Sequence, residues 1–296
     1  MAEGSVALFR SDLVTARAHL EQSLRLCDPQ LPSLSSSGEF ADRVIILALL
    51  TQALWALGYA DQAQARSQEA VALAQQIGHI PSLAYAEAFA TRLCQYRRDA
   101  AATQTHADAI MTLATAHGFG HRIAHGRMLR GWALAMQGDT ATGVSHIRQG
   151  LAAFQDTGPK MWRPYYLALL AEASGQAGQP ETGLTVLAEA LTLIATTEEW
   201  GWEAELYRLQ GALLLQLPRP DVPQADACFQ QALHVACRQQ AKALELRTAL
   251  SRGQLWLAQG QRDEARELLA PIYGWFTEGF DTADLQEARA LLEALA

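Results

Sequence analysis

The chain has 296 residues, of which 50% are hydrophobic and 18% are charged, and this apolar content excludes a disordered chain. Its formal charge of 23 − 31 = −8 argues against nucleic acid or an acidic membrane surface as a partner, because both require a basic protein surface. The longest apolar run, 44–50, is far shorter than the roughly 20 residues of a membrane helix. The first residues also lack the basic and apolar regions of a signal peptide, so we expect a cytoplasmic protein.

A pattern of small residues recurs about every 40 residues along the chain. Each copy has an origin, often a glycine, followed by a small residue five positions later, and all copies but the last have another twelve positions later, as at Gly58, Ala63 and Ala70. The origins fall at Ser11, Gly58, Arg97, Gly138, Gly178, Pro220 and Gly260. Glycine is favoured where a helix ends, and small residues seven apart share one face of the next helix. The pattern therefore predicts pairs of closely crossing helices.

The predicted helices alternate between a first (A) and a second (B) helix of each pair. The B helices are expected at about 12–27, 60–77, 99–116, 140–156, 181–197, 223–239 and 262–276. The A helices are expected at about 39–57, 81–96, 121–137, 161–177, 200–217 and 241–259. No stretch shows the alternation typical of a strand. The predicted fold class is therefore all-α, a superhelix of about seven helix pairs.

The two ends of the array differ. In a last helix at about 282–295, one face carries Leu285, Ala288, Leu292 and Leu295, which predicts an amphipathic cap over 281–296. Before Ser11 there is room for at most about ten residues, which is half of an A helix. A loop insertion at 28–38 lengthens the first spacing. We interpret 1–296 as a single solenoid with a truncated first repeat, either a piece of a longer solenoid or a product that has lost upstream domains.

The spacing resembles that of tetratricopeptide repeats more than that of HEAT repeats, because a small residue often stands seven positions before the origin, as Gly131 does before Gly138. The long repeat is similar to that of maltose-activator-type bacterial regulators. Two stretches, 203–215 and 265–285, resemble the C-terminal repeat region of bacterial proteins that join a nucleotide cyclase domain, an AAA-type ATPase domain and a tetratricopeptide array. The resemblance implies a right-handed α-α superhelix. It also implies a non-enzymatic regulatory module of a cytoplasmic signalling ATPase or cyclase, with a protein or peptide partner, upstream domains of the same polypeptide included.

Motifs for catalysis are missing from the sequence: there is no P-loop, H-E-x-x-H or G-x-S-x-G pattern. One alternative is a metal site at His121 and His125, although Gly118 and Gly120 place His117 poorly as a third ligand. Another is a paired-carboxylate site among Glu198, Glu199, Glu203 and Glu205, which flank Trp200 and Trp202. Packing and helix-start roles explain both groups more simply. We therefore predict no enzyme activity, metal or cofactor.

The concave face remains as a binding surface, because in tetratricopeptide arrays A helices line it. Placing this chain in that register gives the candidate groove residues Gln52, Trp55, Glu87, His125, Met128, Trp132, Tyr165, Glu172, Glu205 and Arg208. Trp132 and Tyr165 are predicted to form an aromatic patch, with Glu172, Glu205 and Arg208 as polar contacts beyond it. Such a lining suits a peptide or a small polar ligand. Two alternatives stay open: these side chains fill a tight superhelix, or the chain is a stand-alone receptor for a peptide or small-molecule signal.

Overall fold

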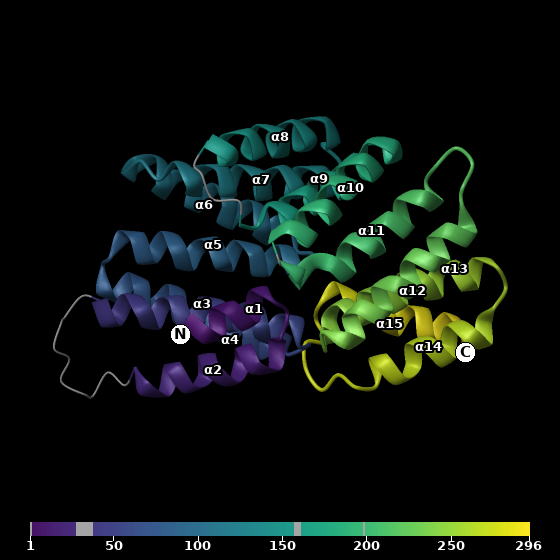
Figure 1. Cartoon of the computed structure of the whole chain (residues 1–296), viewed down its shortest axis with the longest axis horizontal. Helices are drawn as coiled ribbons and strands as arrows, with labels where there is room; N and C mark the ends of the chain where they lie inside the picture. Colours follow the sequence, from purple (N-terminus) through teal and green to yellow (C-terminus); the bar gives the residue numbers. More distant parts are fainter. Residues whose placement is uncertain (1, 28–37, 157–160, 198) are drawn as a thin grey trace.

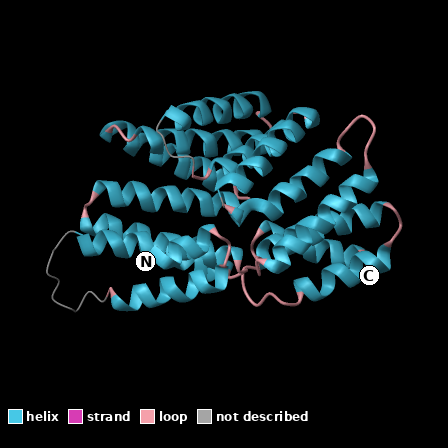
Figure 2. Ribbon diagram, in the orientation of Figure 1, coloured by secondary structure: helices cyan, strands magenta, loops and turns pink. Residues whose placement is uncertain are grey.

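The computed structural model describes residues 2–27, 38–156, 161–197 and 199–296, and it contains helices and no strand over those ranges (Figure 2). The A helices are α1 (Ala2–Phe9), α3 (Gly38–Ala56), α5 (Ile80–Tyr96), α7 (Gly120–Met136), α9 (Arg163–Gln176), α11 (Glu203–Leu215) and α13 (Lys242–Ala258). The B helices are α2 (Leu13–Leu26), α4 (Ala60–Ile77), α6 (Ala100–His117), α8 (Thr140–Asp156), α10 (Pro180–Thr197), α12 (Val222–Arg238) and α14 (Arg262–Tyr273). A short 3-10 helix, η1 (Trp200–Trp202), precedes α11, and α15 (Ala283–Ala294) follows the last pair. The predicted all-α superhelix of seven helix pairs and a last helix is confirmed.

Most turns from an A helix to its B helix share one backbone geometry. Gly58, Gly138, Gly178 and Gly260 have φ values of 92°, 98°, 69° and 79° at these turns. The next residue then donates its N–H to the carbonyl five residues back, as Tyr59 does to Leu54 over 2.9 Å. The predicted origins at these glycines are therefore confirmed as helix C-terminal turns.

The third repeat corrects the sequence register by one residue. The left-handed residue of that turn is Arg98, with φ of 61°, instead of the predicted origin Arg97. The residues five and twelve positions later are then Thr103 and Ile110, and both are fully buried. The pattern misled at this repeat because the buried crossing there uses larger side chains, while small residues happen to stand one position earlier.

The closest helix crossing joins α7 and α8. A Cβ atom added at Gly131 would lie 2.6 Å from the carbonyl oxygen of Gly143, and one added at Gly143 would lie equally close to that of Gly131. Backbone therefore meets backbone at this point, and no flexible side chain is available to move aside. Small residues at the repeat positions therefore allow the two helix backbones to come this close.

Gly131→Ala is therefore expected to destabilise the protein by about 1–3 kcal/mol, because the two helix backbones must separate. Gly120, at the start of the same helix, is the matched control, since an added Cβ there has no atom within 4 Å. Gly120→Ala should be neutral or stabilising by up to about 1 kcal/mol. Urea unfolding followed by circular dichroism measures both changes. Equal midpoints for the two variants would contradict the close crossing.

The array curves until its last repeat meets its second. Successive A helices contact one another from α3 to α13, and α13 in turn contacts α3. The segment between α14 and α15, yellow in Figure 1, lies beside the turn between α3 and α4. There the carboxylate of Glu278 accepts the backbone N–H groups of Asp61 and Gln62 over 3.0 and 3.1 Å. Gly58 makes room for this contact, because a Cβ at that position would lie 2.7 Å from the ring of Trp275.

The first helix pair has a short first helix, and the segment that follows the pair is described only in part. Most of the predicted loop insertion at 28–38 lies outside the described residues, and α3 begins at Gly38. The helix α1 has eight residues, whereas α3 has 19. Within the described ranges, none of the helices combines the length and the apolar character needed to cross a bilayer.

Candidate functional site

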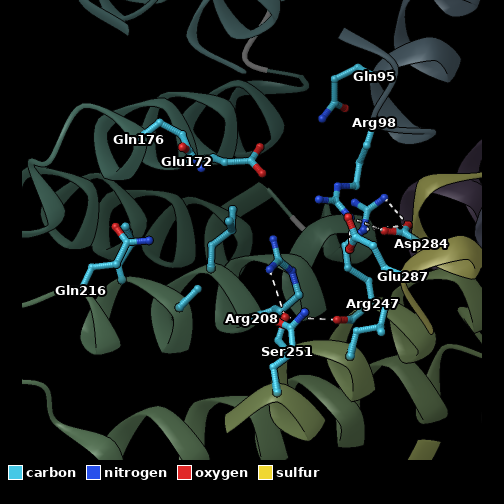
Figure 3. A pocket seen from close by; sticks show the side chains of 15 residues that line it. Gln95, Arg98, Glu172, Gln176, Arg208, Gln216, Arg247, Ser251, Asp284 and Glu287 are labelled. Carbon is cyan, nitrogen blue, oxygen red and sulfur yellow. Dashed lines mark hydrogen bonds and ion pairs between the residues drawn. The ribbon is translucent and has the colours of Figure 1, made fainter. Parts of the chain in front are cut away.

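A polar pocket of about 310 Å³ opens on the side of the array formed by the A helices (Figure 3). Its walls come from α5, α9, α11, α13 and α15, so the curvature of the array assembles it from distant parts of the chain. Its polar lining consists of Gln95, Arg98, Glu172, Gln176, Arg208, Gln216, Arg247, Ser251, Gln254, Asp284 and Glu287. Leu209, Ala212, Leu213 and Leu250 complete it. We call this cavity the polar pocket.

One wall of the polar pocket is an ion-pair network that is buried at Arg247 and Asp284 and exposed at Arg98 and Glu287, and it joins the last helix to the third repeat. The Arg247 guanidinium donates to Asp284 Oδ2 over 2.7 and 3.0 Å and to the Tyr96 carbonyl over 2.6 Å. Arg98 reaches Asp284 and Glu287 over 3.1 and 2.7 Å. Burial alone would raise the pKa of Asp284, but Arg247 and Arg98 outweigh it and hold that pKa below its usual value. Asp284 is therefore charged near neutral pH.

The floor of the polar pocket carries a second ion pair. Arg208 binds Glu205 through two parallel hydrogen bonds of 2.8 and 2.9 Å and also donates to Ser251 Oγ over 3.2 Å. The two residues are three apart on α11, and Glu205 is 5% exposed. Burial would raise the pKa of Glu205, but Arg208 and Arg247 lower it further than burial raises it. Such bidentate pairs are geometrically rigid, so the floor is preorganised.

Glu172 on α9 has a different environment. Its side chain projects into the pocket in Figure 3, and its Oε2 accepts the indole N–H of Trp132 over 2.7 Å. The residue is half-buried. Among the described residues, no lysine, arginine or histidine lies within ion-pair distance of this carboxylate. Trp132 thus orients the carboxylate but does not neutralise it.

Glutamine side chains border the pocket. Gln95, Gln176 and Gln216 stand near the ends of α5, α9 and α11. Gln216 reaches α9 because Gly175 leaves room for it, and a Cβ on Gly175 would lie 3.0 Å from its amide oxygen. Each amide group offers both donors and an acceptor, which is what the peptide bonds of an extended ligand require.

Seven of the ten predicted groove residues fall into two groups in the structure. Glu172 and Arg208 line the polar pocket, and Glu205 lies beneath Arg208. His125, Met128, Trp132 and Tyr165 are instead at most 1% exposed. The expectation that these four present a surface to a ligand is corrected, because the neighbouring A helices pack directly over them. That a ligand contacts Glu172, Glu205 and Arg208 stays a prediction.

The predicted aromatic patch of Trp132 and Tyr165 also needs correction. The ring of Tyr165 packs against Tyr96, Tyr166 and Trp202, with centroid distances of 5.8, 5.1 and 4.8 Å, whereas the recorded polar contact of Trp132 is with Glu172. The Tyr165 hydroxyl donates to Gln95 Oε1 over 3.0 Å. Tyr165 is therefore part of an aromatic core within the curve of the array.

The remaining predicted groove residues lie away from the polar pocket. Gln52 donates to the Tyr96 hydroxyl over 2.9 Å, and Trp55 packs on the Tyr96 ring at 4.6 Å. Both line a smaller, mainly apolar cavity of about 60 Å³ beside α1. Glu87 pairs with His106 over 3.2 Å on the neighbouring helix α6. The structure therefore does not unite all ten predicted residues in one surface.

Side chains proposed for a metal site and for a paired-carboxylate site have other partners in the structure. Both ring nitrogens of His125 are engaged, with the Tyr166 hydroxyl at 2.7 Å and the Ala88 carbonyl at 3.0 Å. Across the described ranges, no three potential metal ligands gather at one point. Of the predicted carboxylate group, Glu199 accepts the backbone N–H of Trp162 and Glu203 pairs with Arg238, while Glu198 lies outside the described residues.

Sequence reasoning missed four charged residues of the pocket: Arg98, Arg247, Asp284 and Glu287. Arg247 carried a usable signal, because Leu244, Leu246 and Leu250 surround it within a predicted A helix, where a buried arginine needs a partner. Its partner Asp284 is 37 residues away, in the last helix, and the spacing pattern says nothing about that contact. The pairing depends on the packing of α15 against α13.

Comparisons with known proteins place the fold in a recognised class. No protein-family model matches the chain. An uncharacterised protein of Rhizobium meliloti (strain 1021) is 26% identical over 220 residues, which is 74% of this chain and 21% of that protein. This chain therefore spans about a fifth of the length of that relative.

Solved structures of Rap proteins are similar over nearly the whole chain. The Rap conjugation gene regulator of plasmid pLS20, in complex with the Phr* peptide, has a TM-score of 0.67 and 12% identity, covering 99% of this chain and 72% of that one. A Rap protein complexed with competence and sporulation factor has a TM-score of 0.67 and 14% identity, covering 99% and 86%. Apo RapI has a TM-score of 0.61 and 12% identity, covering 98% and 96%. These likenesses establish a superhelical helical-repeat fold.

Proposed function

We propose that this chain is a non-enzymatic binding and regulatory module that takes a peptide in the polar pocket. The observation that carries the proposal is a preorganised polar cavity on the A-helix side of a helical-repeat array. Two of the similar Rap structures were solved in complex with the Phr* peptide and with competence and sporulation factor. A volume of about 310 Å³ lies at the lower end of the range for ligand sites and suits a few residues of a peptide.

The lining of the pocket favours a polar ligand over an apolar one. The glutamines offer hydrogen bonds to peptide groups, and the ion pairs of Arg208 and Arg247 fix the walls before a ligand arrives. Preorganised walls lower the entropy cost of binding. Most charges here are already paired within the protein, so specificity would come from hydrogen bonding and shape.

For the biological context, we propose a regulatory module of a bacterial, cytoplasmic signalling ATPase or nucleotide cyclase. The resemblance of 203–215 and 265–285 to the repeat region of such proteins supports this context. So does the relative from Rhizobium meliloti, which is nearly five times as long as the matched region. The alternative is a stand-alone receptor for a peptide or small-molecule signal, which the similarity to Rap proteins over their own length favours.

Cross-linking in the producing cell separates these two contexts. Links from this chain to peptides of an ATPase or cyclase domain would support the module. Links confined to the chain itself would support the receptor. In either case the pocket is the proposed binding site.

Peptide selection tests the pocket. Random peptides are selected on the immobilised protein, and their affinities are then compared for wild type, Ala212→Trp and Glu267→Gln. Ala212 is half-buried in the pocket lining, so a tryptophan there fills the cavity, whereas Glu267 is exposed on α14. We expect wild type and Glu267→Gln to bind equally and Ala212→Trp to bind at least about 30-fold more weakly, with unchanged circular dichroism. Equal binding by all three, or no selected peptide, would contradict the proposal.

A further inference from the structure

The charges around the polar pocket do not balance. Three guanidiniums, those of Arg98, Arg208 and Arg247, face the three carboxylates of Glu205, Asp284 and Glu287 in direct ion pairs. Glu172 is a fourth carboxylate, so the local sum is 3 − 4 = −1. Each guanidinium is held by a carboxylate of the protein and is therefore a poor anchor for a ligand anion. The net charge of the cavity is therefore negative, and Glu172 is the carboxylate of the lining that has no direct ion pair among the described residues, although Arg208 and Arg247 attract it from a longer distance.

The position of Glu172 suits ligand recognition. A half-buried carboxylate loses part of its hydration, and a cation at contact distance restores the lost stabilisation. Its Oε2 is fixed by the indole of Trp132, a side chain that is itself 1% exposed. The rigid indole holds the carboxylate group so that it faces the cavity (Figure 3). The second oxygen, Oε1, is the acceptor that remains for a ligand.

We propose that Glu172 recognises a primary ammonium group of the ligand. This inference rests on the proposed function, because it names the chemistry that the same pocket selects. An ammonium carries three N–H donors on one atom, and Glu172 Oε1 accepts one of them. The amide oxygens of Gln176, one turn further along α9, and of Gln216 provide neighbouring acceptors in the pocket lining. A guanidinium fits less well, since it prefers both oxygens of a carboxylate and one is occupied by the indole.

The ammonium has two sources in a peptide, the N-terminus and a lysine side chain. Four random libraries of tetrapeptide amides distinguish the two sources of the ammonium. Their random positions contain no lysine. They carry a free N-terminus, an acetylated N-terminus, an acetylated N-terminus with one fixed lysine, and an acetylated N-terminus with one fixed acetyl-lysine. The first and third libraries contain a primary ammonium, and the second and fourth are their neutral counterparts.

The indole N–H of Trp132 reports on the site directly, because it donates to the carboxylate in question. The chain has seven tryptophans, and the Trp132 resonance is assigned as the one missing from Trp132→Phe in a nitrogen-15 spectrum. Glu172→Gln is the matched variant, since its amide oxygen still accepts the indole N–H while the charge is removed. Glu267→Gln on α14 removes an equal charge outside the pocket.

We expect at least one ammonium-bearing library to shift the Trp132 resonance and its neutral counterpart to bind about tenfold more weakly or worse. Glu172→Gln should abolish that preference, while Glu267→Gln keeps it. Equal binding of the ammonium and acetylated libraries would overturn the ammonium inference and leave peptide binding in the pocket intact. No binding by any library in affinity measurements, together with failure of the peptide selection, would reject the proposed function itself.

Discussion

Trp132→Ala is expected to destabilise the protein by about 3–5 kcal/mol, because it removes a large side chain that is 1% exposed between A helices. The substitution also leaves the Glu172 carboxylate without its hydrogen bond from the indole, which measures 2.7 Å. The effect on ligand binding then follows from loss of the fold. Such a loss of stability would show that Trp132 packs in the interior and does not contact the ligand.

Urea unfolding of Trp132→Ala, Trp132→Phe and wild type measures this effect. Phenylalanine keeps most of the volume and loses the indole N–H, so it should cost less than alanine, about 1–3 kcal/mol. An unfolding midpoint of Trp132→Ala close to that of wild type would show that the side chain is not part of the packed interior.

Arg247→Leu is expected to destabilise the protein by about 3–5 kcal/mol, since it leaves buried Asp284 without its closest cation and the Tyr96 carbonyl without its donor. These partners belong to α15 and α5, so the loss also loosens the contact between the last helix and the third repeat. Burial tends to lower the pKa of Arg247, but Asp284 and Glu205 raise it above its usual value, so the charge is present at every ordinary pH.

A double-mutant cycle with Asp284→Leu isolates the pair. The double variant should be less destabilised than the sum of the two single changes, because the apolar pair leaves no unpaired charge between the two positions. Arg289→Leu is a suitable control, since Arg289 on α15 is exposed and pairs with Glu293 on the same helix. Strict additivity of Arg247→Leu and Asp284→Leu would contradict a coupled buried pair.

The repeat and its turns could be predicted from sequence because they depend on local rules. Most A helices end in a turn that contains one residue with a left-handed backbone. At four of these turns that residue is a glycine, which marks the turn in the sequence: Gly58, Gly138, Gly178 and Gly260. The rule failed at Arg98, where a residue with a side chain adopts the same backbone conformation and the glycine signal is absent. Burial of Trp132 could not be predicted, because it depends on how tightly successive repeats curve.

The composition of the site depends on contacts that no repeat pattern contains. Glu278 meets Asp61 across 217 residues of sequence, and Arg98 meets Glu287 across 189. These contacts arise only because the array closes between its second and last repeats. The prediction of a polar lining at Glu172 and Arg208 was therefore partial, and the wall formed by α15 was missing from it.

Hydrogen–deuterium exchange with a selected peptide tests the central claim, that the polar pocket is the binding site, most directly. We expect increased protection in the second halves of α9 and α11, at about 172–176 and 208–216, in the middle of α13, at about 247–254, and in α15 around Asp284. The exposed face of the B helices should be unchanged. Protection confined to those B helices, or to the small apolar cavity beside α1, would contradict the account.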